Sequence, residues 1–303
     1  MRFLKPDAEV WEQKFPDSSS KNFQEEYIQY MYEHIEKCGR VCYKSEDHIK
    51  EGSAKDFVQR MLDSKHYAML EHGTVYLKLP NGILSTISGL VEKYKQNSYS
   101  KCKDVLIHNF ENDDIDVMFQ NHCCVTTNYR VIIENNWEDD LQYVCSPTEH
   151  HIKRNTVCFT TDIGVTREFN RHRVDSIAEE STRYCNYTKG KFGSEITYPI
   201  PAWINEEDIP KDLFKSDEWS AIEYWAYCLA VCEDTYNNLI RLGWKPQQAR
   251  QVLPLNTKST LIHTAFETDW EHFFDLRVHG VTGAPHPNAK YVAEIAYNKV
   301  QHG

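Results

Sequence analysis

One stretch near the middle of the chain, RHRVDSIAEESTRY (171–184), concentrates side chains that bind anions. Guanidinium groups match phosphate oxygens in a bidentate way, and hydroxyl groups add neutral donors. The whole chain is acidic, with 34 Lys+Arg against 45 Asp+Glu and a formal net charge of −11. A local cluster of cations in an acidic protein favours a small anionic ligand. It argues against a nucleic-acid binder, which needs a broad basic face.

The spacing within this stretch predicts how its side chains are presented. We expect residues 164–173 to be helical, so that Arg171, His172 and Arg173 fan out in successive directions. Glu179, Ser181 and Arg183 occupy alternate positions and share a direction only in an extended segment. The alternative is a solvated, salt-bridged helix end, which is the common structure around an isolated RHR. The combination of RHR, seven residues and Ser-x-Arg-Tyr favours ligand binding.

Ser181 is also a candidate nucleophile, a role that requires a base to activate it. Its neighbours Glu180 and Thr182 offer no obvious base. We therefore expect Ser181 to act as a hydrogen-bonding residue.

The ten cysteines and the lengths of the apolar runs indicate in which compartment the protein resides. There is no CxxC, no run of about 18 apolar residues and no signal-peptide core at the N-terminus, so we expect reduced thiols, no membrane span and a cytoplasmic protein. One Cys/His cluster, His122-Cys123-Cys124 with Cys145 and His150-His151, lacks regular zinc-ligand spacing. We predict no metal, and a zinc-organised interaction protein stays as an alternative.

Hydrophobic periodicity predicts a mixture of helices and strands. Helices are expected at 22–38, 53–66, 164–173, 218–242, 246–253, 269–278 and 288–300, and strands at 74–79, 125–133, 156–163 and 259–266. The elements do not alternate regularly as βαβ units. This favours an α+β fold with a mixed or antiparallel sheet and flanking helices. No long linker divides the chain, so we expect a single domain over residues 1–303.

Several motifs together resemble one enzyme family. RHR-VDSIAEE-S resembles the RHR-x7-S signature of the flavin-dependent thymidylate synthases. KHYAMLEH (65–72) is similar to the family's His-x4-Glu-His, ARQVLPLN (249–256) to its Ala-Arg-x-x-Leu-Pro-Leu-Asn, and FFDLR (273–277) to its Phe-x-x-Leu-Arg. GRVCYKSED (39–47) is more loosely similar to an Arg-x-Ser segment. The resemblance covers the chain from about residue 39 to its end.

The resemblance implies a reaction and an assembly. Members of the family methylate dUMP to dTMP, with methylenetetrahydrofolate as carbon donor, FAD as redox cofactor and a reduced nicotinamide, here expected to be NADPH, as hydride source. The family is homotetrameric, and several subunits contribute to each active site. The expected partners are therefore small molecules and copies of the chain, without nucleic acid or membrane. The folate-only thymidylate synthases use a Cys in a Pro-Cys-His context, which is absent here.

The resemblance also assigns roles to individual residues. The residues expected to bind FAD are His66, Arg171, His172, Arg173, Glu179 and His272. Those expected to bind dUMP are Glu168, Arg171, Glu179, Ser181, Arg183, Arg250 and Arg277. Ser181 and Arg277 are the expected catalytic residues, which orient and activate dUMP. A cation such as Arg277 beside the pyrimidine would stabilise negative charge as the ring becomes a nucleophile.

The chain departs from the family pattern at several positions. Glu168 replaces a Gln, Ala178 an Asn and Ala68 a small hydroxyl residue, while Phe266 and His272 replace asparagines. Because the last three concern flavin, a nucleotide-binding protein that has lost flavin catalysis is the alternative function. An insertion at about 80–153, expected as an excursion between two strands of one sheet, resembles larger phage-type members. A viral source would place the protein in the host cytoplasm.

Overall fold

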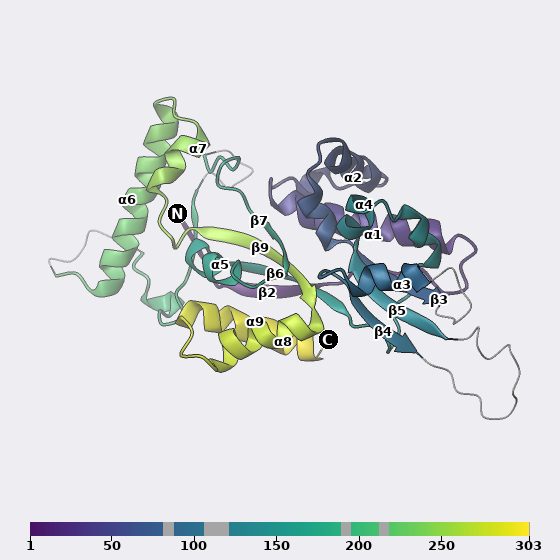
Figure 1. Ribbon diagram of the computed structural model, residues 1–303. Coiled ribbons are helices and arrows are strands. Elements are labelled where there is room, and N and C mark those ends of the chain that lie inside the picture. Colours follow the sequence, from purple (N-terminus) through teal and green to yellow (C-terminus); the bar gives the residue numbers. More distant parts are fainter. Residues whose placement is uncertain (81–87, 106–120, 189–194, 212–217, 303) are drawn as a thin grey trace, which may run out of the picture.

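A four-stranded antiparallel sheet forms the centre of the computed structural model, which describes all residues except 81–87, 106–120, 189–194, 212–217 and 303 (Figure 1). Its strand order is β2-β6-β9-β7. The strands are β2 (Asp7–Trp11), β6 (Arg154–Asp162), β9 (Lys258–Phe266) and β7 (Ser176–Glu179). Most residues of the two central strands are buried, and each strand contains several β-branched residues and a Phe, which favour strands. The fold is α+β with antiparallel sheets, as expected.

A second antiparallel sheet is built largely from the predicted insertion. Its order is β3-β5-β4, with β3 (Thr74–Pro80), β5 (His122–Asn128) and β4 (Lys101–Val105). We expected the insertion to connect two strands of one sheet. This prediction is wrong, because β3 belongs to the second sheet and β6 to the central one. That residues 1–303 form a single domain stays a prediction.

The strand predicted at 125–133 ends early. The side chain of Asn128 accepts a hydrogen bond from the Val131 N–H and caps helix α4 (Tyr129–Glu134). An Asn that satisfies an otherwise unpaired N–H of the first helical turn stabilises the switch from strand to helix. The β-branched residues that follow are buried in the helix instead.

Helices cover both sheets. Helices α1 (Phe23–Val41) and α2 (Ser53–Asp63) contribute Met31, Ile35 and Phe57 to the core of the second sheet, at whose edge α3 (Ser88–Lys95) lies. Helices α5 (Ile163–Phe169), α8 (Glu267–Phe274) and α9 (Pro287–His302) pack on one face of the central sheet. The last turn of α1 reaches the opposite face, where Cys38 and Val41 are buried with Ile262.

Helix α6 (Ala221–Arg241) lies at the far edge of the molecule, followed by the short helix α7 (Pro246–Ala249) (Figure 1). A capping box between Ser220 and Glu223 fixes its start. Its buried side packs around Tyr236, together with the short parallel pair β1 (Arg2–Leu4) and β8 (Thr197–Pro199). The remaining short elements are the 3₁₀ turns η1 (Glu46–His48), η2 (Tyr67–His72), η4 (Glu138–Tyr143), η6 (Glu206–Asp208) and η7 (Arg250–Val252), and the π-helical turn η8 (Asp275–His279).

A chain of buried hydrogen bonds links the two halves of the fold. His72 Nδ1 lies 2.8 Å from Thr264 Oγ1, which lies 2.8 Å from Thr156 Oγ1, which in turn lies 3.0 Å from His34 Nε2. These residues come from η2, β9, β6 and α1. Buried polar groups cost free energy unless they are paired. This series of hydrogen bonds therefore fixes how the helices meet the central sheet.

Gly73, between η2 and β3, is a test of this packing. An added Cβ would lie 2.6 Å from Ile35 Cδ1 and 2.9 Å from Met31 Cγ, both in the buried core. We expect Gly73→Ala to lower the free energy of unfolding by about 1–3 kcal/mol, as overpacking does. Urea denaturation would measure it. Gly89→Ala in α3 is the control, because its Cβ would meet nothing within 4 Å. Equal stability of both variants would contradict the prediction.

Candidate active site

The RHR sequence lies in a turn that follows α5. Asp162 caps the start of α5 by accepting a hydrogen bond of 2.8 Å from the Val165 N–H, and the helix ends at the buried Phe169. The His172 N–H then donates to the Phe169 carbonyl at 3.0 Å, which turns the chain toward β7. The predicted helix over 164–173 is therefore wrong beyond residue 169. The three residues diverge because they lie in a turn.

Arg277, His172 and Glu168 form the first cluster of predicted site residues. Arg277 Nε donates to His172 Nε2 at 3.0 Å, Nη1 to Glu168 Oε2 at 2.7 Å, and Nη2 to the Glu168 carbonyl at 2.8 Å. Arg277 lies on the π turn η8, a type of irregularity that is frequent at functional sites. The cluster joins the end of α5 to the segment that follows α8.

Electrostatics within this cluster keep His172 uncharged. Burial, followed by the nearby Arg277 guanidinium, lowers the pKa of His172 to about 4. Its Nε2 is therefore free to accept the Arg277 hydrogen bond at neutral pH. Burial also lowers the pKa of Arg277, while Glu168 acts in the opposite direction and the like charge of Arg171 adds to the lowering.

Glu179, at the end of β7, is held by neutral donors. Its Oε1 accepts from Thr166 Oγ1 at 2.6 Å and Ser259 Oγ at 3.0 Å, and its Oε2 accepts from Asn170 Nδ2 at 3.0 Å. No described cation pairs with it within 4 Å. Glu179 therefore ties α5 to the β7–β9 pair and has a fixed orientation.

A second cluster forms in the turn after β7. Arg250 Nη1 donates to Thr182 Oγ1 at 3.2 Å, which brings the ARQVLPLN segment against the turn. The Arg183 N–H donates to Ser181 Oγ at 3.3 Å, while the Arg183 guanidinium is exposed and lies 5.2 Å from the centre of the Tyr184 ring. Ser181, Arg183 and Arg250 are therefore brought together.

Sequence reasoning missed an ionic group beneath this turn. The buried carboxylate Oε2 of Glu180 lies 2.6 Å from Lys258 Nζ and 3.6 Å from Lys44 Nζ. Lys258 and Glu180 are distant in sequence and meet through the pairing of β7 with β9. Two features of the sequence pointed to this ionic group. Lys44 lies in the GRVCYKSED segment, and Glu180 is next to Ser181.

Other predicted residues remain apart from both clusters. His66 is exposed at the start of η2, and His272 is exposed with its ring centre 6.2 Å from that of His172. Arg171 and Arg173 are exposed. No hydrogen bond or ion pair between described residues joins the first cluster to the second.

A cavity of about 350 Å³ adjoins the first cluster. Glu168 forms part of its wall together with the aromatic side chains of Trp203 and Trp225. Its polar lining includes Asp162 and Asn288, whose side chains bond each other at 3.2 Å. A cavity with aromatic walls and a few polar groups is of the size and type that binds small ligands.

The side chains in the RHR turn suit a flavin dinucleotide. Within the described part of the chain, the guanidinium groups of Arg171 and Arg173 donate no hydrogen bond to another residue, so both cations are available to a pyrophosphate. His172 adds a neutral ring beside them. The two arginines suit a pyrophosphate, which is the charged part of a dinucleotide such as FAD.

The Cys/His cluster gives no support to the zinc hypothesis. Among the described residues, no three or more His, Cys, Asp or Glu side chains are arranged to hold a metal ion. His151 instead contacts the Leu77 carbonyl at 3.2 Å and Cys145 Sγ at 3.8 Å. All ten cysteines are free, as expected. Within the described residues, no helix combines the length and apolar character of a transmembrane segment.

Comparison with known proteins identifies relatives of the chain. The family model described as thymidylate synthase complementing protein matches residues 107–302. A flavin-dependent thymidylate synthase of Tropheryma whipplei is 28% identical over 163 residues, which cover 52% of this chain and 65% of that protein. One from Pyrococcus furiosus is 29% identical over 113 residues, covering 37% and 41%. The chain thus spans less than two thirds of the length of these relatives.

Among solved structures, the chain is similar to a UMP/dUMP methylase, PolB from Streptomyces cacaoi, bound with 5-Br dUMP. The identity is 18% and the TM-score 0.41, over 98% of this chain and 91% of that chain.

The two causes of the low His172 pKa can be separated. Because burial is the larger cause and Arg277 the second, Arg277→Gln should raise the pKa of His172 above about 4 but leave it below the ordinary value of about 6.5. A titration of the His172 ring by NMR would measure both proteins. A pKa that does not change would show that the guanidinium has no influence, and one that returns fully would show that burial has none.

Proposed function

Because this chain belongs to the thymidylate synthase complementing protein family, we propose that it is a flavin-dependent thymidylate synthase. It converts dUMP to dTMP in the cytoplasm, with methylenetetrahydrofolate as carbon donor, FAD as cofactor and NADPH as reductant. The chain is thus a methyltransferase, and its proposed ligands are all small molecules.

The observation that carries the proposal is the convergence of Arg250 on the turn that holds Ser181 and Arg183. The Arg250–Thr182 hydrogen bond joins two segments separated by 68 positions. The two adjoining segments carry two arginines and a serine, which are the types of donor that a dianionic phosphate needs. In a chain of net charge −11, such a local cation cluster supports a specific phosphate site.

Arg277 is proposed to act on the pyrimidine ring. Its guanidinium would stabilise negative charge that develops on the ring carbonyls as C5 becomes a nucleophile. In the structure, the Glu168 carboxylate pairs with this guanidinium, with Oε2 2.7 Å from Arg277 Nη1. The ring would therefore compete with Glu168, whose side chain is 34% exposed and can move into solvent.

FAD, when bound, supplies the redox chemistry of the reaction. Arg171 and Arg173 would hold its pyrophosphate, and His172 would orient the turn between them. His66, Glu179 and His272 are the other residues proposed to contact it. His66 and His272 are exposed, so a neighbouring subunit can complete their surroundings.

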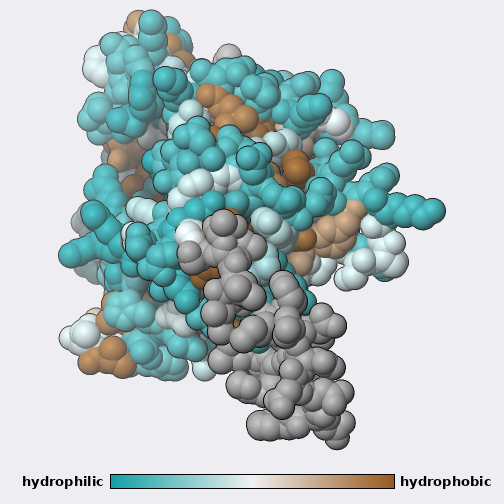
Figure 2. Space-filling model, turned by 45° about the vertical axis from the view of Figure 1, so that its right-hand side comes forward, coloured by the Kyte–Doolittle hydropathy of each residue, from teal (hydrophilic) through white to brown (hydrophobic). Residues whose placement is uncertain are grey.

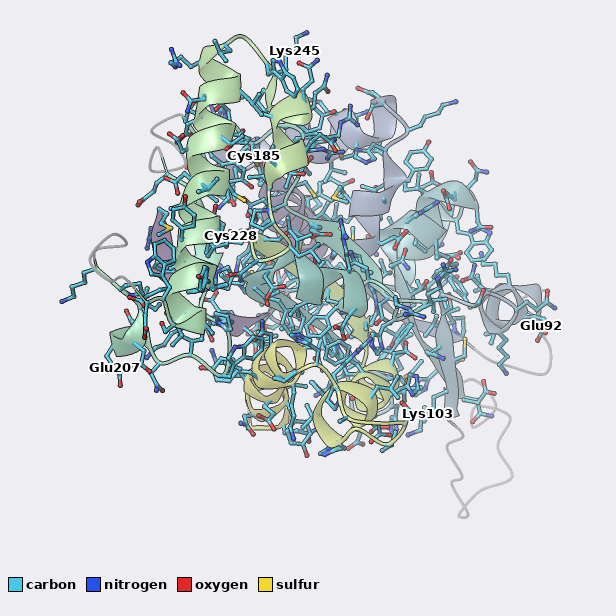
Figure 3. All side chains as sticks on the ribbon, turned by 90° about the vertical axis from the view of Figure 1, so that its left-hand side faces the viewer. Glu92, Lys103, Cys185, Glu207, Cys228 and Lys245 are labelled. Atoms are coloured by element: carbon cyan, nitrogen blue, oxygen red, sulfur yellow. The ribbon has the colours of Figure 1, made fainter. Side chains whose placement is uncertain are left out.

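We also propose that the enzyme is a homotetramer. Helix α6 lies at the edge of the molecule, with Cys228 on it and Cys185 beside it (Figure 3). Large apolar side chains are exposed along it and just after it: Tyr224 at 63%, Leu242 at 70% and Trp244 at 47%. By contrast, the face in Figure 2 is largely hydrophilic, with only scattered apolar patches. Exposed apolar side chains grouped on one element favour an interface between copies. A sedimentation experiment that finds a fully active monomer would contradict it.

The reaction itself provides the first test. Purified protein incubated with dUMP, methylenetetrahydrofolate, NADPH and FAD should form dTMP, and omission of FAD should abolish the product. Chromatography of the nucleotides would measure both reactions. Binding of dUMP without any product would instead support the nucleotide-binding protein that has lost flavin catalysis.

Two variants should separate binding from turnover. Arg250→Ala should weaken dUMP binding by about 10- to 150-fold, because a hydrogen bond to a charged group contributes about 1.5–3 kcal/mol. Arg277→Ala should lower kcat more than it changes dUMP affinity, since its interaction grows as the ring gains charge. Calorimetric titration and steady-state kinetics would measure these effects.

Arg60→Ala is the matched control, because Arg60 is exposed on α2 and belongs to neither cluster. It should leave both quantities unchanged. Equal and small effects of Arg250→Ala and Arg277→Ala would show that the nucleotide binds elsewhere.

A further inference from the structure

A buried carboxylate lies between two lysines beneath the turn of the second cluster. The Glu180 side chain is only 2% exposed, and its Oε2 contacts Lys258 Nζ at 2.6 Å. Oε2 also accepts a hydrogen bond from Thr260 Oγ1 at 3.1 Å. Lys258 is itself largely buried, at 14% exposure. Lys258 and Thr260 therefore satisfy Glu180 Oε2 without a hydrogen bond from Lys44.

Lys44 is the second cation of this group and is held more loosely. Its Nζ lies 3.6 Å from Glu180 Oε2, beyond hydrogen-bond length, and its side chain is 28% exposed. Two ammonium groups therefore share one carboxylate, which leaves a positive charge beneath the turn. The other acid near Lys44 is Glu46, which is exposed to solvent.

The segment that carries Lys44 runs beside the turn of the second cluster. The Ser181 N–H donates to the Cys42 carbonyl at 3.0 Å, and the rings of Tyr43 and Tyr184 lie 5.4 Å apart. Lys44 is thus tied to the turn through the two residues that precede it, Cys42 and Tyr43. An anion held by Ser181 and Arg183 would approach the uncompensated ammonium.

We propose that Lys44 is a further phosphate-binding residue of this site. Its ammonium moves from Glu180 to the phosphate monoester of the bound nucleotide, while Lys258 and Thr260 keep Glu180 neutralised. Without Lys258, the buried Glu180 carboxylate would repel the phosphate. The identity of the anion as the phosphate of dUMP rests on the proposed function, whereas the presence of an anion site at Lys44 does not.

The role of Lys44 can be tested with variants that keep the backbone unchanged. Lys44 has a φ of 49°, and this backbone conformation is as unfavourable for Gln or Arg as it is for Lys. Neither substitution therefore changes the backbone strain at this position. Lys44→Gln removes the charge, and Lys44→Arg keeps it. Lys290→Gln on α9 is the matched control, because Lys290 is a half-exposed lysine that pairs with Glu294 away from the site.

Calorimetric titrations with dUMP, deoxyuridine and inorganic phosphate would measure the effect. Lys44→Gln should weaken dUMP and phosphate about tenfold and leave deoxyuridine unchanged, and Lys44→Arg should restore most of the loss. The control should bind like the wild type. Unchanged dUMP and phosphate affinities in Lys44→Gln, or an equal loss for deoxyuridine, would overturn the proposal.

The same titrations distinguish failure of the proposed function. If the wild type binds phosphate but neither nucleoside nor nucleotide, and Lys44→Gln loses phosphate, the anion site stands and dUMP is the wrong ligand. If the wild type binds no phosphate and no dUMP, the anion site is wrong. Lys258→Met should lower the free energy of unfolding, whereas Lys44→Gln should not, because only Lys258 closely compensates the buried charge.

Discussion

The close pair of Glu180 and Lys258 is the interaction on which the geometry of the candidate phosphate site depends. A buried carboxylate is costly unless a cation and hydrogen-bond donors surround it. The Glu180 N–H donates to the Thr260 carbonyl at 2.9 Å, which extends the β7–β9 ladder by one pair. The chain can leave the sheet only after this point, so Ser181 becomes the first residue of the turn.

The same strand end organises the first cluster through Glu179. Its side chain points to α5, where Thr166 and Asn170 donate to it, whereas the Glu180 side chain reaches Lys258. Successive residues of an extended segment face opposite sides of a sheet. One carboxylate therefore positions the helix that leads into the RHR turn, and the next positions the Ser181 turn. This alternation explains how one short sequence can position both clusters.

Much of this arrangement follows from the sequence, and some of it does not. The buried strands β6 and β9 were predicted within a few residues because their short segments combine β-branched and aromatic residues, which favour strands. The helical periodicity of α6 gave its extent closely. The end of α5 was missed because the residues after Phe169 have ordinary helix propensity. Tertiary contacts, such as Asn170 with Glu179, decide where the helix stops.

The ionic group under the turn was beyond sequence reasoning for a related reason. Lys258 and Glu180 are 78 positions apart, and only the register of β7 against β9 brings them together. Arg250, by contrast, was assigned to the site through a motif, and in the structure it contacts Thr182 beside Ser181. Motifs identify residues that act on a ligand, whereas the register determines which charges support them.

The two ion pairs of the site differ in exposure, and this difference suits different tasks. Glu180 and Lys258 are 2% and 14% exposed, whereas Glu168 and Arg277 are 34% and 17% exposed. A partly exposed pair contributes little to stability because water replaces its contacts, while breaking a buried pair leaves an uncompensated charge. Arg277 can therefore exchange Glu168 for a ligand at small cost, and Lys258 cannot leave Glu180. The buried pair keeps the turn in place, whereas the exposed pair and Lys44 can exchange partners with the proposed anionic nucleotide.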